Sequence, residues 1–437
     1  MNLSLPSLTL LAAMCAFINT HAQSASFSSD TGDNDIEVRE NPVIDGLDEN
    51  FDFNVPPFIR EKHNQIDFNG ADWTSLRARL ENAETIPFTI VHIGDSHIQA
   101  DYATGDTRNY LQFDYGDAGR GLITPLRISG TNQPTDYTFT GTGSWSGVKL
   151  MSQSWPRTMG FTGTSVSPSA STSSFTIATS EKDDYKPFAS VTVFHKGQFF
   201  VTSITDSDGH LIPFVSKPSQ DYTHISLVNE VTSAKINFDS AGDLTIFGVN
   251  LSGNRPGLFY HTIGNNGATY DTYNRIGSVG SGIAPLYPDL VIISLGTNEA
   301  FGRLDTLALM KSIDRFVDNI RKYNSEAQIL LVTPMECQRS TYTSVKGKGK
   351  RRRRSTQRVK TYKINTNIEP IRNAIKKYGK EHHVAVYDWY QVAGGDNAST
   401  KWINDGLFSH DRVHHSHKGY KLQGFLLYQA LRKAFTE

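Results

Sequence analysis

The sequence predicts an α/β protein whose parallel sheet is interrupted by an inserted β-sandwich. Two observations lead to this prediction. Apolar runs typical of buried strands alternate with helical patterns near both ends of the chain. Between residues 123 and 249, Gly, Ser and Thr become dense and short alternating segments replace the helical pattern. We therefore expect one α/β domain built from residues 58–122 and 250–437, with a β-sandwich domain inserted at 123–249.

The first 22 residues have the features of a secretory signal peptide. Leu8 to Ile18 is an apolar core too short to span a bilayer, and Ala22 ends a plausible cleavage site. An uncleaved anchor is the alternative, because no Lys or Arg precedes the core. Cleavage would remove Cys15 and leave Cys337 alone, so no disulfide could form within the mature chain. We expect a periplasmic or secreted protein with no stable membrane insertion after cleavage.

Residues 23–57 are expected to form a mobile or loosely docked arm, because they are rich in Ser, Asp, Asn and Glu. The whole chain has 437 residues, 38% hydrophobic content and a net charge of −1. Such a balance predicts a globular core and no bulk attraction to nucleic acid or membranes.

The α/β elements are expected in a regular order. A helix over 72–82, with Asp72 as a possible N-cap, precedes a buried strand over 88–93. After the insertion, the patterns predict a strand near 288–295, a helix at 304–323, a strand at 327–333, a helix at 364–378, a strand at 384–388 and a closing helix at 419–435.

The insertion shows strand patterns at 174–177, 190–194, 198–201, 234–238 and 244–247. Its aromatic residues have two interpretations, as stacking platforms for a glycan or as filling for the sandwich core. For each single ring, core filling is the favoured interpretation. The candidates are Tyr137, Trp145, Trp155 and Tyr185.

The stretch Gly94-Asp95-Ser96 follows the strand over 88–93. A hydroxyl at the carboxyl end of a buried strand is where open α/β sheets place their active sites. Ser96 is therefore a candidate nucleophile, and Asp95 is expected to fix the turn. Taken alone, the stretch is equally compatible with an ordinary capped turn.

Three later segments supply partners for Ser96. Asp411 stands three residues before His414, so one turn can hold carboxylate and imidazole together as orienting group and base. Asn298 follows the strand near 288–295 and could aim its amide at an oxyanion. Gly267 could offer an exposed backbone N–H.

With Ser, Gly, Asn and His in this order, the sequence resembles the SGNH (GDSL-type) hydrolase family over residues 86–122 and from 248 to the C-terminus. The resemblance implies a three-layer, flavodoxin-like domain and ester hydrolysis without a cofactor. It also implies a Ser96–His414–Asp411 triad. The N–H groups of Ser96 and Gly267 and the Asn298 amide would form the oxyanion hole.

The resemblance extends to secreted bacterial members that act as O-acetylesterases. It is carried by residues 386–389, Gly394-Gly395, Trp402 and the Gly419-Tyr420 helix start. His97 stands where many relatives have Leu, which is similar to the peptidoglycan O-acetylesterase branch. The implied substrate is an O-acetyl ester on peptidoglycan or another polysaccharide. His97 could line the substrate site or only pack there.

Three alternatives stay open: a lipase or thioesterase of the same family, a glycan O-acetyltransferase with the same triad, and a non-catalytic glycan-binding protein. No metal site is expected. His410, His415 and His417 lie near His414 but lack an ordered ligand spacing.

The run Lys346 to Arg354 is the chain's one charge anomaly. It could be a basic flap that attracts an anionic polymer, or a solvated loop open to proteolysis. A single basic run in a neutral chain does not indicate nucleic-acid binding.

Overall fold

The computed structural model describes residues 55–180, 186–346 and 356–437. The signal segment, nearly all of the predicted arm, Tyr185 and residues 347–355 of the basic run lie outside this part. Residues 53–437 form one compact unit. Within the described part, no helix combines the length and apolar character that crossing a membrane requires.

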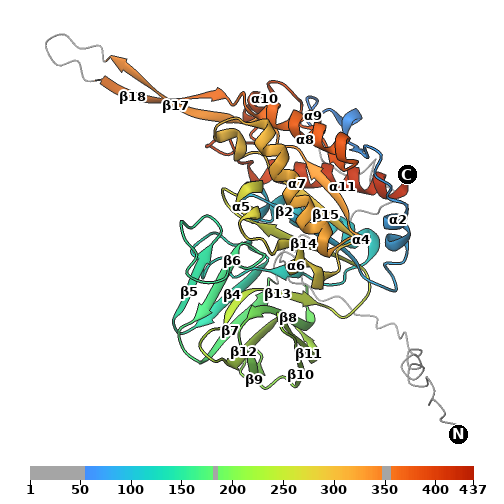
Figure 1. The fold of residues 1–437 in the computed structure, drawn as a ribbon, viewed down its shortest axis with the longest axis vertical. Coiled ribbons are helices and arrows are strands. Elements are labelled where there is room, and N and C mark those ends of the chain that lie inside the picture. The colour runs from blue at the N-terminus through green and yellow to red at the C-terminus, as the bar shows by residue number, and fades with distance from the viewer. Residues whose placement is uncertain (1–54, 181–185, 347–355) are drawn as a thin grey trace, which may run out of the picture. The chain divides into compact units, whose positions relative to one another are not determined.

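A six-stranded sheet forms the centre of the α/β part (Figure 1). It is parallel except for its edge strand β1, which pairs antiparallel with β19. In spatial order the strands are β1 (Ile66–Asp67), β19 (Ala385–Tyr387), β16 (Gln328–Val332), β15 (Leu290–Ser294), β2 (Phe88–Gly94) and β14 (Leu258–Gly264).

The parallel strands are ordered 2-1-3-4-5 along the sheet when they are numbered as they occur in the chain. This is the flavodoxin-like order, and it reverses between β2 and β15. Every residue of β2 is buried, as expected for a strand covered on both faces. Ligands of such sheets bind beyond the carboxyl ends of the strands at the reversal, which is where β2 delivers Ser96.

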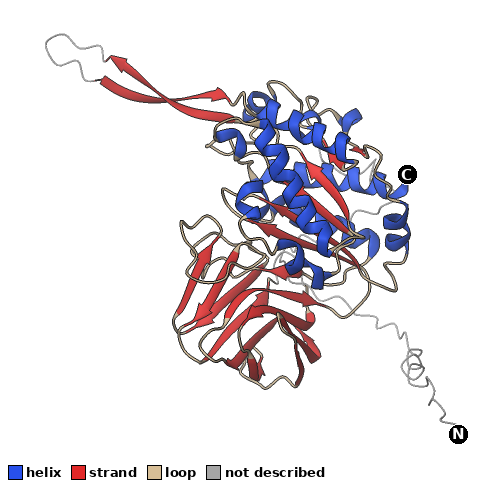
Figure 2. Cartoon of the chain, in the orientation of Figure 1, coloured by secondary structure: helices blue, strands red, loops and turns tan. Residues whose placement is uncertain are grey.

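The two long helices α7 and α11 begin at side-chain caps. Asp305 accepts from Ala308 N at the start of α7, and Ser416 accepts from Gly419 N at the start of α11. Figure 2 shows the helices gathered around the parallel sheet. They are α2 (Thr74–Glu81), α3 (Ser96–Gln99), α4 (Tyr102–Tyr115), α5 (Tyr270–Asn274), α6 (Val279–Ile283), α7 (Thr306–Tyr323), α8 (Ile368–His382), α9 (Trp389–Val392), α10 (Ala398–Asn404) and α11 (His417–Thr436), with 3₁₀ turns at Glu61–His63, Ala284–Leu286 and Glu299–Phe301.

The predicted elements are present, with ends shifted by a few residues. The helix expected at 364–378 begins at Ile368, because a strand that we did not predict occupies residues up to Ile364. Asp72 lies just before the N-cap Trp73 of α2, and its carboxylate accepts from Thr74 N at 2.9 Å.

Residues 121–252 contribute two antiparallel sheets. The seven-stranded sheet and the four-stranded sheet share one apolar core. The first contains β10 (Phe214–Pro218), β11 (Tyr222–Val231), β8 (Phe188–Lys196), β13 (Thr245–Ser252), β6 (Thr164–Pro168) and β5 (Trp145–Lys149), with β3 (Gly121–Ile123) paired to β13; the second contains β4 (Tyr137–Thr142), β7 (Thr172–Thr179), β12 (Ser233–Asp239) and β9 (Phe200–Thr205).

A separate β-sandwich domain at 123–249 stays a prediction. β13 runs to Ser252, across the predicted boundary, and residues 53–437 are one compact unit. Tyr137 fills the core rather than presenting a platform, since it is buried and donates to Thr124 O. Trp145 packs against the same core, and Trp155 remains partly exposed beneath the guanidinium of Arg275.

A β-hairpin that the sequence analysis did not predict extends from the α/β part (Figure 1). Its strands are β17 (Gln338–Lys346) and β18 (Thr356–Ile364), which pair antiparallel. Thr, Tyr and Val favour strands on both sides of the basic run. Because the run is strongly basic, the sequence analysis predicted a flap or a loop here.

Candidate active site

Ser96 lies directly beyond the end of β2, at the first residue of α3. Gly94 permits the sharp turn, because a Cβ at this position would clash with Ile98 and lie 2.8 Å from Ser294 O. Asp95 caps α3 by accepting from His97 N at 2.9 Å. This contact confirms that Asp95 fixes the turn.

Ser96, His414 and Asp411 form one hydrogen-bonded chain. Ser96 Oγ lies 2.7 Å from His414 Nε2, and His414 Nδ1 lies 2.6 Å from Asp411 Oδ2. The other carboxylate oxygen of Asp411 accepts from the backbone N–H groups of Val413 and His414. The structure therefore joins two segments 318 residues apart in the order that proton transfer from a serine requires.

The electrostatics keep Asp411 ionised and make His414 a stronger base. Burial alone would raise the pKa of Asp411, but the hydrogen bonds from His414 and the backbone lower it below its usual range. Asp411 is then an acceptor for Nδ1–H, and Nε2 is left to accept from Ser96. In turn, the Asp411 hydrogen bond raises the pKa of His414 above its ordinary value of 6.5, against the opposing effect of burial.

This shift predicts a pH dependence. Only neutral His414 can take the Ser96 proton, so kcat/KM should fall as the pH drops through the raised pKa of His414, in a limb centred above pH 6.5. The Asp411→Asn variant should shift this limb to lower pH, because the carboxylate that favours the imidazolium is gone. Rate measurements on a small soluble ester from pH 5 to 9 would check both statements; a flat profile, or an unshifted limb in Asp411→Asn, would contradict them.

The backbone N–H groups of Ser96 and Gly267 are expected to contribute to the oxyanion hole. The N–H of Ser96 is at the first position of α3 and has no acceptor within the helix. Gly267 has a φ of +80°, and in the described residues its N–H makes no recorded hydrogen bond. A Cβ there would meet only Met151, at 3.6 Å, so the approach to this loop is open.

Asn298 is held by two hydrogen bonds. Its Nδ2 donates to Ala268 O at 3.0 Å and to Asp95 Oδ2 at 3.2 Å. The side chain thus connects the loop of Gly267 to the turn of Ser96. To donate to an oxyanion it would redirect one of these hydrogens, and the bond to Asp95 is the longer of the two.

The sequence analysis missed the residues that hold the Gly267 loop. Gln99 is buried on α3, accepts from Asn266 N at 2.7 Å and donates to Asn132 Oδ1 at 2.7 Å. Asn265 donates to Tyr273 OH, which donates to Gly94 O. These contacts fix the loop to α3 on one side and to β2 on the other. Their side chains are ordinary amides and phenols, and only the three-dimensional arrangement shows their role.

Gln99→Ala is expected to lower kcat for ester hydrolysis by about tenfold with little change in KM, because the loop loses its bond to α3 while substrate contacts remain. Gln112→Ala is the matched control. Gln112 is also buried, but it bonds to Gly119 O and Leu258 O away from the loop. Both variants should lower the thermal midpoint, and only Gln99→Ala should lower kcat. Equal kcat values in the two variants would show that Gln99 has no positioning role.

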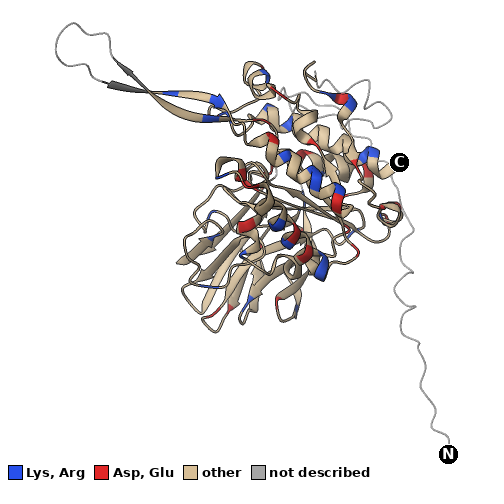
Figure 3. Cartoon of the chain, turned by 45° about the horizontal axis from the view of Figure 1, so that its top comes forward, with Lys and Arg blue, Asp and Glu red and all other residues tan. Residues whose placement is uncertain are grey.

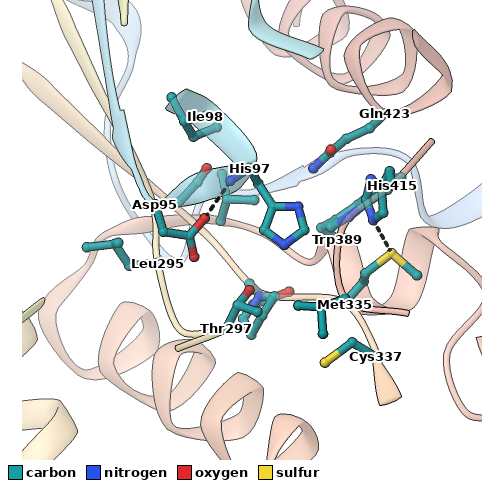
Figure 4. A pocket seen from close by; sticks show the side chains of 15 residues that line it. Asp95, His97, Ile98, Leu295, Thr297, Met335, Cys337, Trp389, His415 and Gln423 are labelled. Atoms are coloured by element: carbon teal, nitrogen blue, oxygen red, sulfur yellow. Dashed lines mark hydrogen bonds between the residues drawn. The ribbon is translucent and has the colours of Figure 1, made fainter. Parts of the chain in front are cut away.

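His97 points into a pocket beyond the sheet, in the neighbourhood of Asp95, Thr297 and Trp389 (Figure 4). The Nδ1 atom of His97 lies 3.2 Å from Tyr420 OH. The ring centroid of His97 lies 5.2 Å from the ring centroid of His414. It is thus close enough to border the site, and its contact with substrate stays a prediction.

The other histidines near His414 differ in setting. His415 is buried with Nε2 3.0 Å from Met335 Sδ, and burial lowers its pKa to about 3. His410 and His417 are exposed. In the described part of the chain, the group close enough to share a metal ion is Asp206, Asp208 and His210, in the turn after β9.

Comparison with known proteins agrees with the geometry. Residues 247–422 match the sequence profile of the GDSL-like lipase/acylhydrolase family. The match covers less than half of the chain's 437 residues, so it is a similarity of this segment to the family. The matched segment contains Gly267, Asn298, Asp411 and His414, and it begins after Ser96. The match supports acylhydrolase activity in general terms.

Solved structures similar to this chain include a peptidoglycan O-acetylesterase, at 21% identity and a TM-score of 0.66, covering 85% of this chain and 99% of the other. That likeness shows a shared fold. A lipase/acylhydrolase from Enterococcus faecalis matches at 19% identity (TM-score 0.28, 41% and 77% covered). A GDSL-like lipase from Bacteroides thetaiotaomicron matches at 21% identity (TM-score 0.29, 40% and 76% covered). No curated protein sequence matches this chain.

Proposed function

We propose that this protein is an exported serine esterase that removes O-acetyl groups from a cell-wall or extracellular glycan. The observation that carries the proposal is the continuous hydrogen-bonded chain from Ser96 Oγ through His414 to Asp411. It supplies a nucleophile, a base and an orienting carboxylate at the reversal point of the sheet, where a substrate can reach them.

The proposed reaction has two steps. His414 Nε2 takes the proton of Ser96 Oγ as this oxygen attacks the ester carbonyl carbon. The oxyanion is stabilised by the N–H groups of Ser96 and Gly267 and by the Asn298 amide. The bond to the sugar oxygen then breaks, and His414 gives its proton to that oxygen, leaving an acetyl group on Ser96.

Water completes the cycle. His414 takes a proton from a water molecule, which attacks the acetyl carbon and forms a second oxyanion. When the bond to Ser96 breaks, acetate leaves and His414 returns the proton to Ser96 Oγ. Atoms balance as one ester and one water giving one alcohol and one acetic acid, which ionises to acetate and a proton.

The choice of a glycan ester rests on observations outside the triad. It is supported by the similarity of fold to a peptidoglycan O-acetylesterase and by the signal-like first 22 residues. That fold similarity covers 85% of the chain, which is more than the α/β part alone, so it also favours the two β-sheets as an inserted module that grips the glycan.

The test is acetate release from O-acetylated peptidoglycan, acetylated xylan and p-nitrophenyl acetate, with the wild type and Ser96→Ala. We expect release by the wild type and none by Ser96→Ala. Ser294→Ala is the matched control, since Ser294 Oγ also contacts a histidine, lying 2.6 Å from His92 Nε2, but that histidine contacts Tyr260 OH instead of a carboxylate. This control should retain activity.

No acetate release from these three substrates, with hydrolysis of a long-chain p-nitrophenyl ester tested beside them, would indicate a lipase or thioesterase. Transfer of acetyl to an added glycan, faster than release to water, would indicate a transferase. Equal release by Ser96→Ala and the wild type would refute the proposal.

A further inference from the structure

The β17–β18 hairpin concentrates positive charge. Between Gln338 and Ile364, eleven of 27 residues are Lys or Arg and none is Asp or Glu. Because the whole chain has a net charge of −1, the rest of the chain carries −12. In the cartoon of Figure 3, Lys and Arg positions are coloured blue on the described part of the two strands. This local excess attracts anions although the protein as a whole does not.

The register of the hairpin divides its side chains between two faces. Tyr342 pairs with Lys360 and Ser340 with Tyr362, so these four residues share one face. The opposite face carries the pairs of Arg339 with Lys363 and Thr341 with Thr361. We call the face that carries Ser340, Tyr342, Lys360 and Tyr362, together with Arg412, the tyrosine face.

The tyrosine face offers an exposed ring beside oriented cations. The side chain of Tyr342 is 61% exposed, and Lys360 across from it is also exposed. The Nζ of Lys360 lies 5.1 Å from the centre of the Tyr362 ring, and the Cζ of Arg412 lies 4.1 Å from it. Tyr362 therefore orients both cations, and Tyr342 lies on the same face with most of its surface exposed.

The tyrosine face begins at the catalytic loop. Tyr362 OH donates to His410 O at 3.2 Å, and Arg412 Nη1 donates to Gln338 Oε1 at 2.9 Å. Gln338 N also donates to Arg412 O at 2.9 Å. Arg412 directly follows Asp411 in the sequence, so this end of the face is one residue from the triad.

We propose that Tyr342, Lys360 and Arg412 form a binding subsite for a glycan chain that carries carboxylates. A sugar ring can stack on Tyr342, and the two cations can pair with carboxylates along the same chain. The assignment of this chain as substrate rests on the proposed esterase function, whereas the binding itself does not. A nucleic acid would satisfy the charge, but it carries no acyl ester to bring to Ser96.

The test is a binding measurement on the full chain with Ser96→Ala, so that no substrate is turned over. Isothermal titration calorimetry at a fixed salt concentration would compare an oligogalacturonate with a neutral xylo-oligosaccharide of equal length and a single-stranded DNA of equal charge. Tyr342→Ala and Lys360→Ala are the test variants. Lys363→Ala is the matched control, because it removes the same charge from the same strand on the opposite face.

We expect the oligogalacturonate to bind more tightly than the other two probes. Tyr342→Ala should weaken this binding by about tenfold and Lys360→Ala by roughly threefold or more, with little change in Lys363→Ala. An equal loss in the Lys360 and Lys363 variants, no loss in the Tyr342 variant, or preferred binding of DNA or of the neutral chain would each overturn the proposal. Because the binding assay needs no catalysis, its failure would leave the proposed esterase function intact. Likewise, a failure of the esterase assay would leave the binding proposal intact.

Discussion

His414→Ala is expected to lower kcat for ester hydrolysis by about 10⁴- to 10⁶-fold. Without the imidazole, the proton of Ser96 has no acceptor at 2.7 Å, and the leaving sugar oxygen has no proton donor. The fold should survive, because the His414 side chain is 38% exposed and contributes little to the core. Steady-state kinetics on p-nitrophenyl acetate, together with thermal unfolding of both proteins, would check the loss.

His417→Ala is the matched control for this variant. His417 is an exposed histidine three residues further on, at the start of α11, and its ring lies 5.0 Å from that of Tyr102. Its kcat should stay within about twofold of the wild type, as is usual for exposed positions away from the chemistry. A His414 variant that keeps a tenth of the activity, or parallel losses in both variants, would require a different base.

Asn298→Ala is expected to lower kcat by about 10²- to 10³-fold with little change in KM, because an oxyanion exists in the transition state and not in the bound ester. The variant also removes the bonds to Ala268 O and Asp95 Oδ2, so the Gly267 loop loses support. Initial rates over a range of ester concentrations would separate kcat from KM.

Asn274→Ala is the control for the structural part of this effect. Asn274 also donates through Nδ2 to a backbone carbonyl, that of Ser312 at 2.9 Å, but it lies on α5 outside the triad. It should lower the thermal midpoint without a large change in kcat. The oxyanion role of Asn298 is wrong if kcat falls equally in Asn274→Ala and Asn298→Ala. It is also wrong if Asn298→Ala raises KM and leaves kcat unchanged.

Much of the site could be predicted from the sequence because its geometry is local. Asp411 and His414 are three residues apart, and one turn joins their side chains. Ser96 follows an apolar run that could only be a buried strand, and the alternation of strands with helices predicts the parallel sheet. The rule that sites lie at the carboxyl ends of strands then brings these segments together.

The supporting contacts could not be predicted, because they join distant segments through side chains of no special type. Gln99 contacts Asn266 across 167 residues, and nothing in either segment marks the pair. The β17–β18 hairpin was missed for another reason. Residues such as Tyr342 and Val359 favour strands, but the strongly basic run between them led to the prediction of a loop. The boundary of the insertion was placed by a change in composition, whereas β13 continues past it to Ser252.

The central claim is that Ser96 is the nucleophile, and covalent labelling tests it most directly. The protein would be treated with a fluorophosphonate, which phosphonylates activated serines, and the product analysed by intact and peptide mass spectrometry. We predict one adduct per chain, on the peptide that contains Ser96, absent from Ser96→Ala and strongly slowed in His414→Ala. An adduct on another serine, or equal labelling of the Ser96→Ala protein, would contradict the claim.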